Sequence, residues 1–150
     1  MGQMGQGPGE MDTRSAQLAA GAMAAAPVIY AAIGLGMRFG GMMDETGLAG
    51  IEDDLGPLLG IIFLVLGTLF VAVSFVLRMR VSGGQGIMER FRFVLICMAL
   101  AETAGVLGLV HLFLTGSLTI PCALWGIALV GAAFHFPTRS WLEQDHGCDA

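Results

Sequence analysis

The sequence contains no lysine and little charge of either sign. Charged residues make up 13% of the 150 residues, hydrophobic residues make up 55%, and the mean hydropathy is +0.76. A soluble domain carries roughly 25% charged residues, because water must solvate its surface. Seven basic residues stand against twelve acidic ones, so the chain also lacks the positive charge of a nucleic-acid-binding protein. These absences exclude an ordinary soluble domain and predict an integral membrane protein.

Catalytic and metal-binding motifs are missing as well. The three cysteines, Cys97, Cys122 and Cys148, are too few and too dispersed for a disulfide-stapled domain, and we expect free thiols. His111 could meet Cys122, but two ligands do not make a metal site. No nucleophile–base pair and no phosphate loop is recognisable. The sequence therefore predicts a protein that is not an enzyme and that has no catalytic residues, no metal and no cofactor.

Long uncharged runs dominate what is present. Two runs of 23 residues carry no formal charge, one after Arg14 and one after Asp54. A helix rises about 1.5 Å per residue, so roughly 20 apolar residues cross a hydrocarbon core about 30 Å thick. The stretch 93–136 would be about 66 Å long as one helix, and Thr115-Gly116-Ser117 is the only turn signal near its middle. We therefore expect an all-α polytopic membrane protein with a transmembrane domain over 15–136 and four transmembrane helices, over about 15–37, 55–77, 93–114 and 118–136.

The arginines predict the orientation of these spans. With four crossings, both tails and the 78–92 loop share one side, which carries Arg14, Arg78, Arg80, Arg90, Arg92 and Arg139. The other side carries Arg38 alone, so both termini are expected in the cytoplasm. We expect a flexible tail over 1–14 and an interfacial cytoplasmic tail over 137–150. The acidic 38–54 loop is interpreted as solvated, with cation gathering at the mouth of a pathway as the alternative.

Glu102 is the most informative residue of the sequence. It lies about 14 Å from the start of the third span, close to the expected bilayer midplane. An ionised carboxylate there costs at least ~2.5 kcal/mol, and no arginine lies inside a span to pair with it. A protonated Glu102 could donate a hydrogen bond to a backbone carbonyl, to Thr103 or to Ser74. Two interpretations stay open, namely a reversible proton or cation site and a neutral carboxyl that only joins two helices.

Small residues surround Glu102 at helical spacing. Ala101 and Gly105 are four residues apart, as are Ala104 and Gly108. Such pairs allow another helix backbone to approach closely in a membrane. We therefore predict that these four residues form a helix-packing surface, with the partner helix in this chain or in another copy.

The stretch ALAETAGVLGLVHLFLTG, residues 99–116, resembles the carboxylate helix of the c-type proteolipid subunits of rotary ATPases. The resemblance places Glu102 at the ion-carrying position and implies a proton- or cation-handling membrane subunit. It covers about 18 of the 150 residues. The preceding span lacks the dense glycine ladder of that family, and the 78–92 loop lacks its Arg-Gln-Pro turn.

A broader pattern resembles small uncharacterised bacterial membrane proteins with four helices. The shared motifs are Ala99-Leu100-Ala101-Glu102, Leu114-Thr115-Gly116 and Pro137-Thr138-Arg139. This resemblance implies the bacterial cytoplasmic (inner) membrane and brings no activity. A displacement of 77 residues also sets 22–37 beside the third span, which suggests two parallel hairpin repeats.

Two functional hypotheses follow from the sequence. The first is a non-enzymatic packing or accessory component of the lipid bilayer, which associates with itself or with a larger membrane complex. The alternative is a proton- or cation-handling subunit in which Glu102 is the reversible carboxyl. Neither hypothesis involves nucleic acid.

Overall fold

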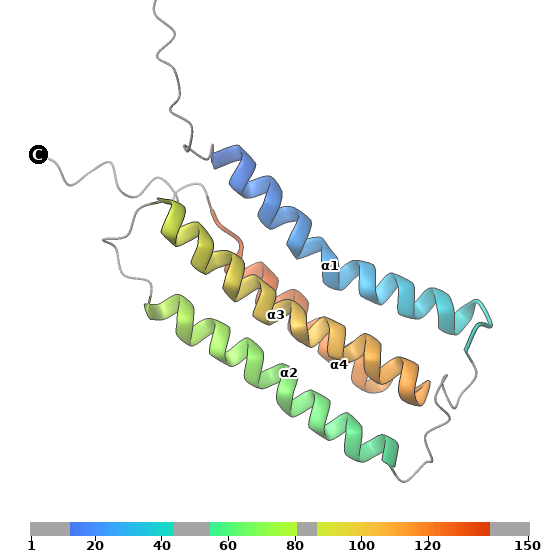
Figure 1. Cartoon of the computed structure of the whole chain (residues 1–150). Helices are drawn as coiled ribbons and strands as arrows, with labels where there is room; N and C mark the ends of the chain where they lie inside the picture. Colours follow the sequence, from blue (N-terminus) through green and yellow to red (C-terminus); the bar gives the residue numbers. More distant parts are fainter. Residues whose placement is uncertain (1–12, 44–54, 81–86, 139–150) are drawn as a thin grey trace, which may run out of the picture.

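The structure is a computed structural model that describes residues 13–43, 55–80 and 87–138. Regular structure in these ranges consists of four α-helices (Figure 1): α1 Thr13–Phe39, α2 Leu55–Arg80, α3 Ile87–Thr115 and α4 Thr119–His135. The expected all-α fold is confirmed. Most of the two predicted tails and of the acidic loop, residues 1–12, 44–54 and 139–150, lies outside the described ranges.

Three of the helices, α1, α2 and α3, are long and apolar enough to cross a membrane. The fourth helix, α4, is apolar but has only 17 residues. At about 1.5 Å per residue it is about 26 Å long, slightly less than the thickness of a hydrocarbon core. The structure therefore supports three membrane spans, and the crossing by α4 stays a prediction.

The helices extend beyond the predicted apolar spans where the chain becomes polar. Helix α3 begins at Ile87 rather than at residue 93, and its first turns carry Glu89, Arg90 and Arg92. Helix α2 continues to Arg80 rather than to residue 77. The charges mark the end of the apolar segment, whereas the backbone hydrogen bonds of the helix continue past them.

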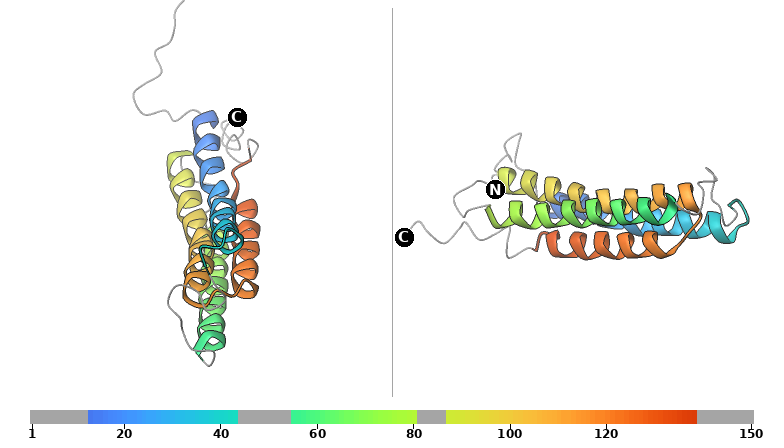
Figure 2. Two further views of the ribbon diagram at one scale, coloured as in Figure 1. Left: turned by 90° about the vertical axis from the view of Figure 1, so that its right-hand side faces the viewer. Right: turned by 90° about the horizontal axis from the view of Figure 1, so that it is seen from below.

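The bundle is an up-and-down arrangement in which α1 and α3 run in one direction and α2 and α4 in the other (Figure 1). Helices α3 and α4 pack against each other at the centre, and each also contacts α1 and α2. Seen from the side and from below, α3 and α4 occupy opposite faces, with α1 and α2 on the two flanks (Figure 2). The shared direction of α1 and α3 fits the suggested repeat, which stays a prediction.

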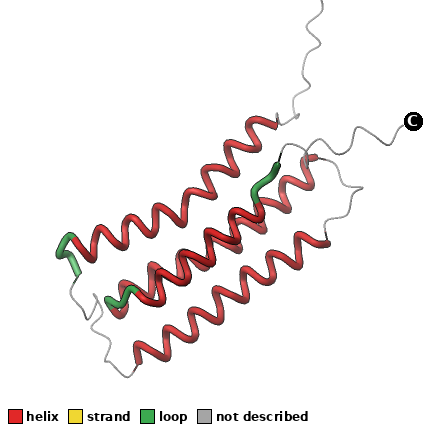
Figure 3. The backbone as a smooth tube through the Cα atoms, turned by 180° about the vertical axis from the view of Figure 1, so that it is seen from behind, coloured by secondary structure: helices red, strands yellow, loops and turns green. Residues whose placement is uncertain are grey.

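The turn between α3 and α4 lies at the predicted Thr115-Gly116-Ser117. It is one of the two described loop segments that Figure 3 draws in green at this end of the bundle. Gly116 has φ +67°, a left-handed conformation that favours glycine. Its N–H donates to Leu112 O at 2.8 Å, and the Ser117 N–H donates to Thr115 Oγ1 at 3.3 Å. These bonds end α3 and return the chain directly into α4.

Small residues predominate at the contact of α2, α3 and α4, and many bulky aliphatic residues lie on the outside. Ala101, Ala104 and Ala128 are fully buried at the contact of α2, α3 and α4, together with Leu124. Large apolar side chains on α1, α2 and α4 are more than half exposed, among them Leu18, Ile61 and Val130. So many exposed large apolar side chains set this bundle apart from a soluble one, in which most of them face inward.

Candidate functional site

Glu102 contacts Tyr30 of the neighbouring helix α1. The Tyr30 hydroxyl donates a hydrogen bond to Glu102 Oε1 at 2.6 Å. Both residues are half-buried, and each lies near the middle of its own helix, Tyr30 in α1 and Glu102 in α3. The bond joins two helices whose contacting residues are 72 positions apart in the sequence.

The expected partners of Glu102 were wrong. Thr103 donates to Ala99 O of its own helix at 3.0 Å, and Ser74 lies in a different polar cluster. The pairing of Tyr30 with Glu102 was missed because a tyrosine in an apolar run is usually interpreted as a core residue or a membrane-interface residue. One signal was available, since Tyr30 is the single tyrosine of the chain and lies inside the first span.

The Tyr30 ring is held in place by Gly105 and Trp125. A Cβ atom on Gly105 would lie 3.2 Å from Tyr30 Cδ2, so a side chain at this position would displace the ring. Trp125 Nε1 donates to the carbonyl oxygen of Gly105 at 3.1 Å, which fixes α4 against the same turn of α3. The hydroxyl of Tyr30 is therefore aimed at Glu102 by packing on three helices.

The second carboxyl oxygen of Glu102 reaches the surface of the bundle. Tyr30 is the only recorded hydrogen-bond partner of Glu102 in the described ranges, and it uses Oε1. Within these ranges, His111 Nε2 is the only fully buried side-chain polar atom that lacks a partner, so Oε2 of Glu102 is not fully buried. The carboxyl is thus anchored through Oε1, while Oε2 is unpaired and at least partly accessible.

The predicted packing residues face the interior of the chain itself. Ala101 and Ala104 have no exposed surface, and Gly105 and Gly108 are buried. A Cβ on Gly108 would lie 3.2 Å from Leu124 Cβ and 3.0 Å from Trp125 Nε1 of α4. This surface therefore packs within the chain, against α4, with α2 at Ala104 and Tyr30 of α1 at Gly105.

A second polar cluster, which sequence reasoning missed, joins α2 to α4. His135 Nε2 lies 2.8 Å from Ser74 Oγ, which itself donates to Val71 O at 2.6 Å. Arg78 Nη1 lies 3.5 Å from His135 Nδ1. An arginine can only donate, so Nδ1 accepts from Arg78 and the Nε2–H donates to Ser74. Because the Ser74 proton points to Val71 O, this arrangement is not an activated nucleophile.

His111 lies buried between α2, α3 and α4, near the Gly116 turn. Thr115 Oγ1 donates to His111 O at 3.0 Å and lies 3.3 Å from Nδ1. The Phe63 ring meets the imidazole edge to face, with centroids 6.0 Å apart. Cys122 is exposed and takes no part in this contact. Among the described residues, no group of three or more His, Cys, Asp or Glu side chains could hold a metal ion.

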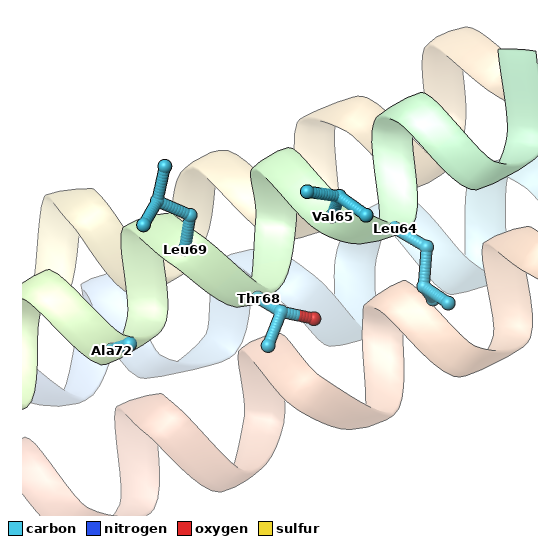
Figure 4. A pocket seen from close by; sticks show the side chains of 5 residues that line it. All are labelled: Leu64, Val65, Thr68, Leu69 and Ala72. Atoms are coloured by element: carbon cyan, nitrogen blue, oxygen red, sulfur yellow. The ribbon is translucent and has the colours of Figure 1, made fainter.

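An apolar groove of about 400 Å³ runs along the outer side of α2 and is lined by side chains of that helix. Figure 4 shows its lining residues, with Leu64 and Thr68 pointing toward α4. They are Leu64, Val65, Thr68, Leu69 and Ala72. The hydroxyl of Thr68 is the single polar group of this lining, so the groove has no convergent polar groups of the kind that fix a small ligand.

The structure therefore defines an all-helical chain with three candidate membrane spans and a half-buried carboxyl at mid-bundle. Comparison of the chain with known protein families, with curated proteins and with solved structures gives no match.

Proposed function

We propose that this chain is a non-enzymatic integral membrane protein in which Glu102 is a reversible proton-binding carboxyl. Its four helices would cross the bacterial cytoplasmic membrane with both termini in the cytoplasm. The three long apolar helices and the exposed aliphatic side chains support the membrane location. The arginines at one end of the bundle support the orientation.

The observation that carries the proposal is the one-sided anchoring of Glu102. Tyr30 fixes Oε1, while Oε2 lies at the surface of the bundle. A carboxyl that served only to join α1 to α3 could use both oxygens inside the bundle. The open oxygen can instead take up and release a proton without separation of the helices.

A proton suits this site better than a metal cation. The site offers two carboxyl oxygens and one phenol oxygen among the described residues, whereas hard cations such as Ca²⁺ and Mg²⁺ take about six or more oxygen ligands. Protonation also removes the charge that hydrocarbon disfavours. The neutral carboxyl keeps Oε1 as the acceptor for Tyr30 and carries its proton on Oε2.

The test is modification of the carboxyl by a hydrophobic carbodiimide, which reacts with the protonated form. Monomeric protein in detergent should gain one adduct at Glu102, and the reaction should slow as the pH rises. Glu102→Gln should abolish the adduct. Glu89, exposed in the first turn of the same helix, is the matched control, because a water-soluble carbodiimide should modify it and leave Glu102 unmodified. A rate at Glu102 that does not depend on pH would contradict the proposal.

The packing or accessory role stands as a second candidate, because the bond from Tyr30 to Glu102 ties α1 to the central pair α3 and α4. In that role Glu102 serves only as a structural link. An absent carbodiimide adduct, together with a loss of stability on removal of the Tyr30 hydroxyl, would favour this candidate.

A further inference from the structure

We propose that two copies of this chain pair through the outer face of α3, where Thr103 of each copy accepts a hydrogen bond from Glu102 of the other. The inference rests on the proposed protonation of Glu102 and names the partner that completes that site. The residues of the face are Ile96, Ala99, Thr103, Val106 and Val110.

The face is an exposed stripe on the most outward side of α3. Ile96 is 50% exposed, Val106 is 41% exposed and Val110 is 38% exposed. The residues of the stripe are alternately three and four positions apart. This spacing is typical of the contact between two helices that cross at a shallow angle. Helix α3 lies on one face of the bundle, with α1 and α2 on the flanks (Figure 2). The exposure of Ile96, Ala99 and Val106 leaves the stripe open to another bundle.

An unpaired hydrogen-bond donor beside this stripe, on protonated Glu102, indicates what kind of surface covers the stripe. Protonated Glu102 would carry its proton on Oε2, which is not fully buried and has no hydrogen-bond partner among the described residues. In hydrocarbon an unsatisfied polar group is costly, and lipid tails offer no acceptor. A protein surface with an acceptor at the same depth would satisfy it.

Thr103 provides that acceptor. Its own hydroxyl proton is used within α3, since Thr103 Oγ1 donates to Ala99 O at 3.0 Å. The lone pairs of Oγ1 stay available at the exposed side of the helix. The protonated carboxyl supplies one donor and Thr103 supplies one acceptor, so the pair is complementary without any further group.

The membrane favours a second copy as the source of this acceptor. Copies inserted in one orientation are related by an axis along the membrane normal, so each residue meets residues of the same depth on its partner. Glu102 of one copy then faces Thr103 of the other, and the two contacts are equivalent. Ala99 is small and lies one turn before Thr103 on the stripe, which lets the two α3 backbones approach at this depth.

The experiment is oxidative cross-linking of single cysteines in native membranes, with Cys97, Cys122 and Cys148 replaced by alanine. Ala99→Cys and Val106→Cys should form disulfide-linked dimers. Val130→Cys on the outside of α4 is the matched control, since it is 55% exposed and lies beside Gly131, which packs against Ala101. Equal cross-linking at Val130→Cys, or none at Ala99→Cys and Val106→Cys, would overturn the proposal.

Two further substitutions separate this inference from the proposed function. Thr103→Val keeps the shape but removes the acceptor, and should weaken the dimer about tenfold through two lost bonds, while carbodiimide still modifies Glu102 of the detergent monomer. Glu102→Gln keeps a donor for Thr103 and should preserve the cross-links while it abolishes modification. Unchanged cross-linking in Thr103→Val would contradict the proposed contact. A failure of modification alone would contradict only the protonation on which it rests.

Discussion

At the residue scale, the polar side chains inside the bundle act in pairs that bridge helices. Tyr30 and Glu102 join α1 to α3, and Ser74 and His135 join α2 to α4. Ala101, Gly131 and Val71 pack closely between these two pairs, with Ala101 Cβ 2.8 Å from the position of a Cβ on Gly131. The two pairs are therefore separated by apolar contacts.

Removal of the Tyr30 hydroxyl should lower the stability of the bundle. Tyr30→Phe keeps the ring against Gly105 but loses the 2.6 Å hydrogen bond to Glu102, so we expect a loss of about 0.6–2 kcal/mol in the free energy of unfolding. Unfolding in mixed detergent micelles measures it. In a double-mutant cycle with Glu102→Leu, the second substitution should cost less in the Tyr30→Phe background, because the shared bond is already gone. Additive effects would mean that the two side chains do not interact.

The Ser74 cluster predicts a comparable cost at the other helix contact. Ser74→Ala leaves the Nε2–H of the fully buried His135 without its acceptor, and we expect a loss of about 1–3 kcal/mol. Thr68→Val on the same helix is the control, since Thr68 is exposed and should change the stability by less than about 0.5 kcal/mol. Equal effects at the two positions would show that Ser74 is not a specific partner of His135.

At the element scale, glycine and alanine decide how closely the central helices approach. Cβ atoms added to Gly67 and Gly131 would lie 2.6 Å from Leu124 Cδ2 and 2.8 Å from Ala101 Cβ, respectively. Both distances are shorter than van der Waals contact. The contact of α2, α3 and α4 thus depends on the absence of side chains at these positions.

Two alanine substitutions on α4 should therefore differ in the sign or size of their effect on stability. Gly131→Ala overpacks the contact with Ala101 and should destabilise the protein by about 1–3 kcal/mol. Gly126→Ala meets open space on the same helix and should be neutral or slightly stabilising, because alanine favours helix. Thermal unfolding of the two variants in one detergent makes the comparison. Similar midpoints would contradict the packing described for α4.

The sequence predicts the helices and the turn well because they depend on residues that are close together in the chain. The uncharged runs, Gly116 and the arginines mark the helices and the turn without any knowledge of packing. Which helices touch depends on side chains far apart in the chain, so Tyr30 was not recognisable as the partner of Glu102, nor Ser74 as the partner of His135. The small residues Ala101 and Gly105 predicted close packing, but only the structure shows that α4 and Tyr30 fill the space beside them.

At the scale of the whole molecule, the up-and-down order places the starts of α1 and α3 at the same end of the bundle as the ends of α2 and α4 (Figure 1). Glu89 lies at this end and is exposed, and Ser117 is exposed at the opposite end. These two positions report the orientation of the protein without disturbing the interior.

Single cysteines at these positions should react with a membrane-impermeant thiol reagent from opposite sides. In protein without native cysteines, Ser117→Cys should react in intact cells, whereas Glu89→Cys should react only after the membrane is opened. The excess of arginines at the Glu89 end is the physical reason. Reaction of Glu89→Cys in intact cells would reverse the proposed orientation, and reaction of both from one side would exclude a crossing by α3, the helix between them.

The placement of α1 and α2 on opposite flanks has a consequence for biosynthesis. The first hairpin to leave the ribosome consists of two helices that pack mainly on α3 and α4 rather than on each other. Until the second hairpin is made, the Tyr30 hydroxyl lacks the Glu102 carboxyl that accepts its hydrogen bond, and Gly67 has no Leu124 to pack against. The first two helices must therefore wait without a packing partner, and translation from Ile87 onward both supplies the centre of the fold and closes it.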